Sequence, residues 1–335
     1  MAQIDFLSGS YSEGAPSGIH RLRLDTATDE LSVVAALPGA PDASFFVADA
    51  TGRRLYVTNE PDARLGAFSL SPDALALTRL SDQPTGAGLP CHVGLSPEGT
   101  HVAVANYGAG RTTLFAIDPI SGALSGDAQL LEGTQSTADG HAHWVGWSPD
   151  GRFIHVVDLG HDEVRAYPWD GARAGAPIIS VGLDKGAGPR HLAFDRSGQF
   201  AFLITEYANT LTALRVEGDG RLSPIETHST LPKGYAEKSF GAHIQVVGSM
   251  VYVSNRGHNS IAAFRIGPEG RLTLTQIVPT GGNWPRFFLA IDAHLLVCNQ
   301  LSDDITLFTL QPDGRMGATG RRLALHKPVM LMPLD

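Results

Sequence analysis

Histidine, arginine and glutamate side chains interrupt the apolar segments of this chain at regular intervals, where core packing alone would favour apolar residues. One set stands where an apolar segment begins: Ser44, Cys91 with His92, His143, Arg190, His243 and Arg286. A second set stands where the following segment ends: Asn59, Asn106, Asp158, Glu206, Asn255 with Arg256, and Asn299. If the two sets face one another, they form a polar site.

The arginines of these sets indicate the kind of ligand. Arg190, Arg256 and Arg286 gather in a chain whose formal net charge is −9. Left unpaired in one place, such guanidinium groups would destabilise the fold. A pocket for a carboxylate or a phosphate explains them, because the planar guanidinium fork suits both groups.

A strand–turn–strand phrase positions these residues along the chain. Each copy reads as a short apolar strand, a turn of the Ser-Pro-Asp-Gly kind and a second apolar strand that ends in a polar residue. The copies are 93–106, 145–158 and 192–206, then 45–59, and more loosely 244–255 and 287–299, with a partial copy at Phe6–Tyr11. Pro, Asp and Gly suit such turns, and the Val, Ile, Leu and aromatic residues around them favour strands.

An alternating third strand follows each phrase, for example at 112–117, 210–216 and 304–310, and most units add a fourth. Four strands in about 48 residues are typical of one β-propeller blade. The 335 residues have room for seven such units, so we predict an all-β, seven-bladed β-propeller that forms a single domain over residues 1–335. We expect the C-terminal run 320–334 to close the ring against the N-terminal strands, because closure removes exposed sheet edges. A β-sandwich and an open array of repeats are the alternatives.

In a propeller, inner strands begin and second strands end at the same face, so both polar sets are expected at one mouth of the central channel. Some members have a structural alternative: we expect Asn59, Asn106 and Asn299 chiefly to tie blade to blade. For Asp158, capping a turn and contacting a ligand are both open. His141 and His143 share a strand face, yet no cysteine or carboxylate stands at a suitable spacing, and no phosphate-binding or dinucleotide motif appears in a strand-to-helix context. We therefore expect neither a metal nor a cofactor.

Composition argues against several functional classes. The negative net charge argues against non-specific nucleic-acid binding, which needs a basic face. Two cysteines cannot form a disulfide framework, and we expect Cys91 and Cys298 to be free thiols in different blades. No apolar run approaches the roughly 18 residues of a membrane span, and residues 1–10 lack the features of a secretory signal. We expect a cytoplasmic protein without a membrane partner, of open oligomeric state.

Several phrases resemble the bacterial lactonase family of seven-bladed propellers, over nearly the whole chain. The most specific are Gly188–Phe194 followed by Glu206, and Val253–His258; Val104–Gly108, His141–Val145 and Val157–Gly160 support them. The family includes one class of 6-phosphogluconolactonase. It is also related to the fungal 3-carboxy-cis,cis-muconate lactonizing enzyme.

The resemblance implies an active site. The histidine, two arginines and glutamate proposed for the muconate-lactonizing relatives match His143, Arg190, Arg256 and Glu206, all of which belong to the two polar sets. The implied function is hydrolysis of a small anionic lactone, with 6-phosphoglucono-δ-lactone as the leading substrate. Other members of the sets are expected to contact the substrate: Arg286, His92, Asn106, Asp158 and His243. A 3-carboxymuconate cycloisomerase and a non-enzymatic binding scaffold are the alternatives.

Overall fold

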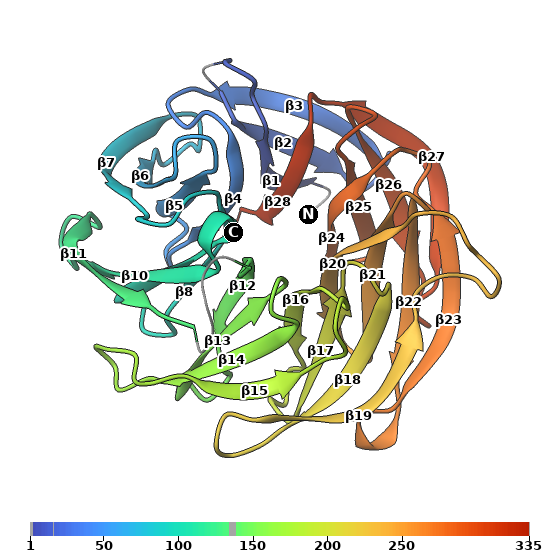
Figure 1. Cartoon of the computed structure of the whole chain (residues 1–335). Coiled ribbons are helices and arrows are strands. Elements are labelled where there is room, and N and C mark those ends of the chain that lie inside the picture. Colours follow the sequence, from blue (N-terminus) through green and yellow to red (C-terminus); the bar gives the residue numbers. More distant parts are fainter. Residues whose placement is uncertain (1–2, 16, 134–138, 335) are drawn as a thin grey trace.

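The computed structural model describes residues 3–15, 17–133 and 139–334. This part of the chain forms seven four-stranded antiparallel sheets, arranged as blades around a central axis (Figure 1). Its helical elements are the two 3₁₀ turns η1 (Tyr107–Ala109) and η2 (Pro268–Gly270). The predicted seven-bladed propeller is therefore confirmed.

Each blade runs from an inner strand beside the axis to an outer strand at the rim. Blade 1 contains β28 (Pro328–Pro333), β1 (Gln3–Ser10), β2 (Ile19–Asp25) and β3 (Glu30–Leu37). Blade 2 contains β4 (Ala43–Ala48), β5 (Arg54–Asn59), β6 (Arg64–Leu70) and β7 (Leu77–Pro84). Blade 3 contains β8 (Pro90–Leu95), β9 (His101–Asn106), β10 (Arg111–Ile117) and β11 (Leu124–Leu131). Blade 4 contains β12 (Ala142–Trp147), β13 (Phe153–Asp158), β14 (Glu163–Pro168) and β15 (Ile178–Gly182).

The remaining blades repeat this order. Blade 5 contains β16 (Pro189–Phe194), β17 (Phe200–Thr205), β18 (Thr210–Val216) and β19 (Leu222–Ser229). Blade 6 contains β20 (Phe240–Val247), β21 (Met250–Arg256), β22 (Ser260–Ile266) and β23 (Leu272–Pro279). Blade 7 contains β24 (Pro285–Ile291), β25 (His294–Asn299), β26 (Asp304–Leu310) and β27 (Met316–Ala324).

The two ends of the chain close the ring. β28 pairs with β1, so blade 1 combines a C-terminal inner strand with N-terminal outer strands (Figure 1). This confirms the predicted closure, but the predicted closing segment 320–334 was too long. Residues 320–324 belong to β27, because Ala324 still pairs with Asp304 of β26 in blade 7.

Local turn chemistry and packing between blades explain why this sequence folds so. In the turn from β12 to β13, Gly151 adopts a φ of 71°, which favours glycine, and the Ser148 hydroxyl accepts a hydrogen bond from the Phe153 amide. The core lies between neighbouring blades: Leu114 of blade 3 packs with Val145 and other buried residues of blade 4. Both faces of each sheet are thus largely covered.

Each inner strand has an irregular register near its first residue. One residue is left unpaired in five inner strands: Cys91 in β8, His143 in β12, Arg190 in β16, Arg286 in β24 and Val329 in β28. In β4 and β20 the irregular interval holds two residues, Ser44–Phe45 and Ala242–His243. Bulges of this kind redirect side chains and are common beside active sites. Here they act at one mouth of the axial channel.

Candidate active site

The second polar set is shifted by one residue in blade 5. The residue that pairs opposite the start of each inner strand is Asn106 in blade 3 and Asp158 in blade 4, but Thr205 in blade 5. Glu206 therefore lies one position beyond the strand end. Counted from the irregular position of each inner strand, the equivalent residues around the ring are Tyr11, Glu60, Tyr107, Leu159, Glu206, Arg256 and Gln300. In blade 6 the pairing continues one residue further, so Arg256 is still part of β21.

Glu206 joins two of the predicted arginines. Its Oε2 atom accepts a hydrogen bond from Nε of Arg190 at 3.1 Å and forms an ion pair with Nη2 of Arg256 at 2.8 Å. The Arg190 side chain is only 2% exposed, whereas that of Glu206 is 16% exposed at the mouth. Burial, together with the positive charges of Arg256 and Arg286, lowers the pKa of Arg190 to about 9, while Glu206 opposes this shift. The carboxylate is thus what makes two buried guanidinium groups tolerable.

Backbone and aromatic groups hold the two arginines in place. Nη1 of Arg190 donates to the carbonyl of Ala242 at 2.6 Å, and Nη2 of Arg256 donates to the carbonyl of Gly241 at 3.2 Å. The guanidinium of Arg256 also lies 5.3 Å from the ring centre of Trp284, a cation–π contact. Blade 6 therefore positions both cations against Glu206.

A second carboxylate faces the third arginine. Oε1 of Glu60 accepts a hydrogen bond from the Tyr11 hydroxyl at 2.8 Å and lies 3.7 Å from Nη2 of Arg286. The Arg286 guanidinium stacks over the Tyr11 ring, 5.5 Å from its centre. Burial would lower the pKa of Arg286, but it is outweighed by neighbouring groups that include Glu60 and Glu206, so the pKa is raised. Both carboxylates thus act on one cation.

From the sequence, the three arginines were expected to be unpaired without an anionic ligand, and these pairings correct that expectation. Three arginines meet two glutamates of the same chain, so Arg190, Arg256 and Arg286 retain one positive charge between them. The mouth is accordingly a balanced site with a small positive excess. It can bind an anion, but the fold does not need one to neutralise it.

His143 lies in the same mouth beside a thiol. Its Nδ1 atom is 3.8 Å from Sγ of Cys91, and its ring meets that of Tyr107 edge-on at 5.7 Å. Burial and the charges of Arg190 and Arg286 hold the pKa of His143 well below its ordinary value, so its ring is neutral at pH 7. Burial also raises the pKa of Cys91 to about 12, which keeps this thiol protonated and unsuited to nucleophilic attack.

Below the mouth, a ring of aromatic side chains closes the channel. Ring centres are 4.1 Å apart for Phe45 and His92, 5.3 Å for His92 and His191, 5.5 Å for His191 and His243, and 3.9 Å for His243 and Phe287. The space left between this ring and Arg190 is about 10 Å³, room for at most one water molecule. The ring is therefore the floor of the site.

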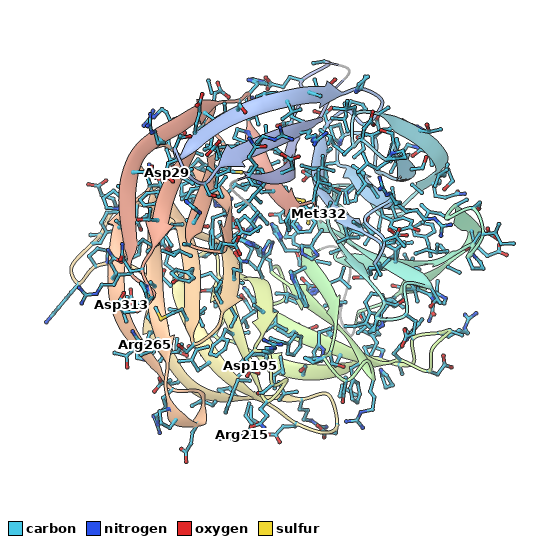
Figure 2. The ribbon with its side chains drawn as sticks, turned by 180° about the vertical axis from the view of Figure 1, so that it is seen from behind. Asp29, Asp195, Arg215, Arg265, Asp313 and Met332 are labelled. Carbon is cyan, nitrogen blue, oxygen red and sulfur yellow. The ribbon has the colours of Figure 1, made fainter. Side chains whose placement is uncertain are left out.

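His92 and His243 belong to this floor and were expected at the mouth. His243 is the second residue of the irregular interval in β20, and His92 follows Cys91 in β8. Successive residues of a strand point to opposite sides, so these two rings do not point where the first irregular residue points. His92 also lines a cavity of about 930 Å³ at the opposite end of the channel, beside Met332. Figure 2, the view from behind, shows Met332 near the axis. Contact of His92 or His243 with substrate stays a prediction.

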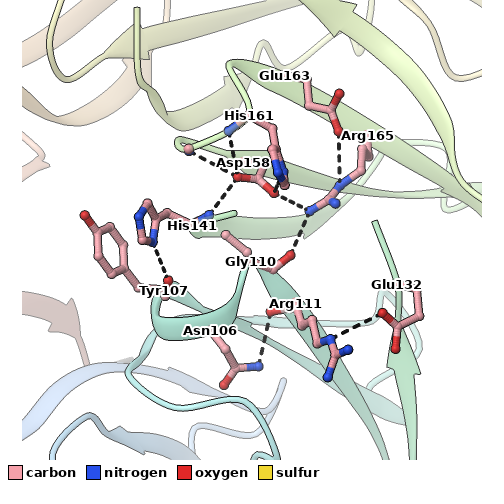
Figure 3. A network of polar contacts seen from close by, with 12 residues as sticks. Asn106, Tyr107, Gly110, Arg111, Glu132, His141, Asp158, His161, Glu163 and Arg165 are labelled. Atoms are coloured by element: carbon pink, nitrogen blue, oxygen red, sulfur yellow. Dashed lines mark hydrogen bonds and ion pairs between the residues drawn. The ribbon is translucent and has the colours of Figure 1, made fainter. Parts of the chain in front are cut away.

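Asp158 is fully buried and both of its oxygens have partners (Figure 3). Oδ1 accepts from the backbone amides of His141, Gly160 and His161, and Oδ2 lies 2.9 Å from Nη2 of Arg165. Arg165 in turn donates to the carbonyl of Gly110 in blade 3. Of the two roles open from the sequence, this geometry favours capping a turn. The same carboxylate also fixes the backbone of His141, which precedes β12 and stacks on Tyr107 at the rim of the site.

Asn106 is also fully buried, with its amide nitrogen donating to the carbonyl of Arg111 and to the Thr113 hydroxyl. Asn299 repeats this arrangement with Asp304 and Thr306. These bonds stay within one blade, so the expected ties from blade to blade are wrong for Asn106 and Asn299. The reason is that the side chain turns toward the third strand of its own sheet. Asn59, by contrast, donates to the carbonyl of Pro41 in the connection from blade 1 to blade 2.

Several residues of the mouth were missed from the sequence: Tyr11, Glu60, Tyr107 and Trp284. The first three occupy the position of Glu206 in their own blades, one residue beyond the polar strand end. Aligning the repeats one residue further would have found them. Trp284 precedes β24 and carried no such signal.

Cys91 and Cys298 are free thiols in blades 3 and 7, as predicted. Within the described ranges, no group of three or more His, Cys, Asp or Glu side chains is arranged to hold a metal ion. Nor does any helix in that part of the chain have the length and apolar character to span a membrane.

Comparison with known proteins places this geometry in context. Residues 5–333 match the family model described as "Lactonase, 7-bladed beta-propeller". The chain is 30% identical over 337 residues to 6-phosphogluconolactonase of Bacillus subtilis, an alignment that covers 96% of the chain and 95% of the relative. Among solved structures it is similar to a periplasmic gluconolactonase of Pseudomonas aeruginosa, with 27% identity, a TM-score of 0.90 and 99% of each chain covered. A Lactobacillus plantarum protein is similar with 27% identity and a TM-score of 0.88, over 99% of this chain and 100% of that one.

Proposed function

The chain belongs to the lactonase family of seven-bladed β-propellers, and from this membership we propose that it hydrolyses the ester bond of a sugar-acid lactone. The leading substrate is 6-phosphoglucono-δ-lactone, which would open to 6-phosphogluconate. The Bacillus relative named 6-phosphogluconolactonase and the Pseudomonas relative named gluconolactonase support this substrate class. Water adds to the acyl carbon, and the ring oxygen leaves as an alcohol.

One observation carries the proposal: the two oxygens of Glu206 have different surroundings. Oε2 is held by Arg190 and Arg256, whereas Oε1 has no hydrogen bond to any residue that the structure describes. The side chain is 16% exposed, so Oε1 is the oxygen free to meet a ligand or water. A carboxylate fixed through one oxygen and free at the other is suited to accept a proton from water.

In the proposed reaction Glu206 is the general base. Oε1 takes a proton from water as that water attacks the lactone carbonyl, while the two arginines keep the carboxylate in place. Neutral His143 can hydrogen-bond the attacking water or the departing alkoxide. We assign the base role to Glu206, because its free oxygen Oε1 is accessible at the mouth. The orienting role falls to His143, whose lowered pKa makes it a weaker base than an ordinary histidine.

The arginines would stabilise the oxyanion of the tetrahedral intermediate. Nη2 of Arg190 and Nη1 of Arg256 form no hydrogen bond within the described ranges, although the other nitrogens of both groups have partners. Donors already held in position need no rearrangement when negative charge develops, and this is usually a large part of catalysis. The single excess positive charge at the mouth also favours an anionic substrate.

A substrate comparison tests the proposal. The purified protein is incubated with 6-phosphoglucono-δ-lactone and, separately, with 3-carboxy-cis,cis-muconate, with and without EDTA. We expect decay of the lactone well above its spontaneous hydrolysis, unaffected by EDTA, and no lactone from the muconate. Lactone formation from the muconate would instead indicate a cycloisomerase. Inertness toward both would contradict the proposed hydrolysis, and inertness together with a captured protein partner would favour the binding scaffold.

A further inference from the structure

The mouth holds a second carboxylate that the proposed hydrolysis does not use. Glu60 occupies in blade 2 the position that Glu206 occupies in blade 5, one residue beyond the strand end. The two side chains are equally accessible, each 16% exposed. Glu60 is therefore placed to meet the same ligand from another side of the channel.

Glu60, like Glu206, is held through one of its two oxygens. Oε1 receives the Tyr11 hydroxyl at 2.8 Å and faces Arg286 at 3.7 Å. Burial, with a further contribution from Glu60, raises the pKa of Tyr11, so this phenol remains a hydrogen-bond donor. Oε2 of Glu60 accepts no hydrogen bond from the residues that the structure describes. A fixed acceptor with free lone pairs therefore faces the mouth.

An ionised carboxylate can only accept hydrogen bonds, and its natural small-molecule partners are hydroxyl groups. It also repels other carboxylates, so a substrate with several carboxylates is disfavoured on the side of Glu60. Hence the two glutamates differ in role: Glu206 lies between two arginines, and Glu60 presents an acceptor next to one.

We infer that Glu60, held by Tyr11 and Arg286, recognises hydroxyl groups of the substrate. Through this contact the site takes a polyhydroxylated lactone in preference to a lactone without hydroxyl groups or one with several carboxylates. This inference rests on the proposed function for the reaction but concerns a separate property, recognition of the hydroxyls. Glu60 is a substrate-binding residue in this assignment, and Tyr11 is a positioning residue that acts through it.

The test compares polyhydroxylated ligands with ligands that carry the same carboxylate or δ-lactone group but no hydroxyl groups. Binding of gluconate and of hexanoate, two six-carbon monocarboxylates, is measured by calorimetry. Hydrolysis of glucono-δ-lactone and of δ-valerolactone is measured as kcat/KM. Each is done for the natural protein, for Glu60→Gln and Tyr11→Phe, and for the control Glu269→Gln, which alters an exposed glutamate in the turn between β22 and β23.

We expect Glu60→Gln to weaken gluconate binding and glucono-δ-lactone hydrolysis by roughly 10- to 100-fold, the size of one hydrogen bond to a charged group. Hexanoate and δ-valerolactone should change little, and Glu269→Gln should behave as the natural protein. Tyr11→Phe should have a smaller effect in the same direction, and it replaces Glu60→Gln as the test if that variant fails to fold.

Equal effects of Glu60→Gln on the hydroxylated and the bare ligand would overturn the inference, even if the protein hydrolyses lactones. Gluconate selectivity that depends on Glu60, in a protein that hydrolyses no lactone, would support the inference and reject the proposed function. The two failures are thus distinguishable.

Discussion

Replacing Glu206 by glutamine separates the base role from the structural role of this residue. Glutamine keeps the shape and one acceptor oxygen, so Arg190 and Arg256 retain a partner, but it cannot take a proton from water. Loss of a general base lowers the rate by about 10²- to 10⁴-fold, which is about 2.7 to 5.4 kcal/mol in the activation barrier. We expect this loss in kcat, with a much smaller change in KM.

The same substitution has a cost in stability. A hydrogen bond of 3.1 Å from Arg190 and an ion-pair contact of 2.8 Å with Arg256 change from a charged to a neutral acceptor. Each loses roughly 1 to 1.5 kcal/mol, so the free energy of unfolding should fall by about 2 to 3 kcal/mol. Thermal unfolding must therefore be recorded first, and the kinetics measured well below the transition of the variant.

The assay follows lactone ring opening at constant pH, corrected for spontaneous hydrolysis, for Glu206→Gln, Glu206→Asp and His143→Ala. Glu206→Asp keeps the negative charge but has a side chain shorter by one methylene group. Compared with Glu206→Gln, it should regain more of the free energy of unfolding than of kcat. A folded Glu206→Gln protein with kcat within a few-fold of the natural value would refute the base assignment. If His143→Ala then lost about 10²- to 10⁴-fold, the base would be His143.

Three further predictions concern stability and closure. Burial and the charge of Arg190 lower the pKa of His92 to about 3. Between pH 6.5 and pH 3 only the unfolded chain takes up this proton, so the free energy of unfolding decreases as the pH is lowered through this range. Phe45 and Phe287 occupy the positions equivalent to His92 in their blades, so His92→Phe should fold. Between pH 7 and pH 5 its free energy of unfolding, measured in urea, should fall by about 2 kcal/mol less than that of the natural protein; equal decreases would contradict this. Asp158→Asn removes the closer of two carboxylates at Arg165, which is 1% exposed, and leaves Glu163 at 3.8 Å. It should cost about 3 kcal/mol in unfolding free energy, the lower end of the cost of breaking a buried ion pair, with KM unchanged; a raised KM at permissive temperature would restore the substrate role. Removing β28 opens the edge of β1 and should abolish cooperative thermal unfolding, whereas a soluble, cooperative truncated protein would refute the closure argument.

Much of the fold follows from local patterns. The turn residues and the alternating third strands predicted strand positions closely: 210–216 and 304–310 coincide with β18 and β26. This worked because turn chemistry and period-two alternation act over a few neighbouring residues. The closing strand was less well located, since the end of β27 depends on how far its neighbour β26 continues to pair.

The sequence indicated which residues gather at the mouth better than it indicated their exact positions along the strands. His143, Arg190 and Arg286 lie at the irregular positions of their inner strands, and Glu206 joins Arg190 to Arg256 as one cluster. The positions of His92, His243 and Glu206 were each misjudged by one residue. A shift of one residue on a strand moves a side chain to the other face, and a bulge that causes such a shift is defined by pairing with the next strand.

The amino-acid sequence by itself therefore determined a closed seven-bladed ring and the end of its channel where polar groups gather. Those features come from repeated short-range patterns, which any copy of the phrase displays. Only the tertiary structure decided which charges pair. Tyr11, Glu60 and Arg286 come from β1, β5 and β24 or the residues next to them, and they meet because closure brings blades 1, 2 and 7 together. Such contacts depend on the geometry of the whole ring, so no local segment encodes them.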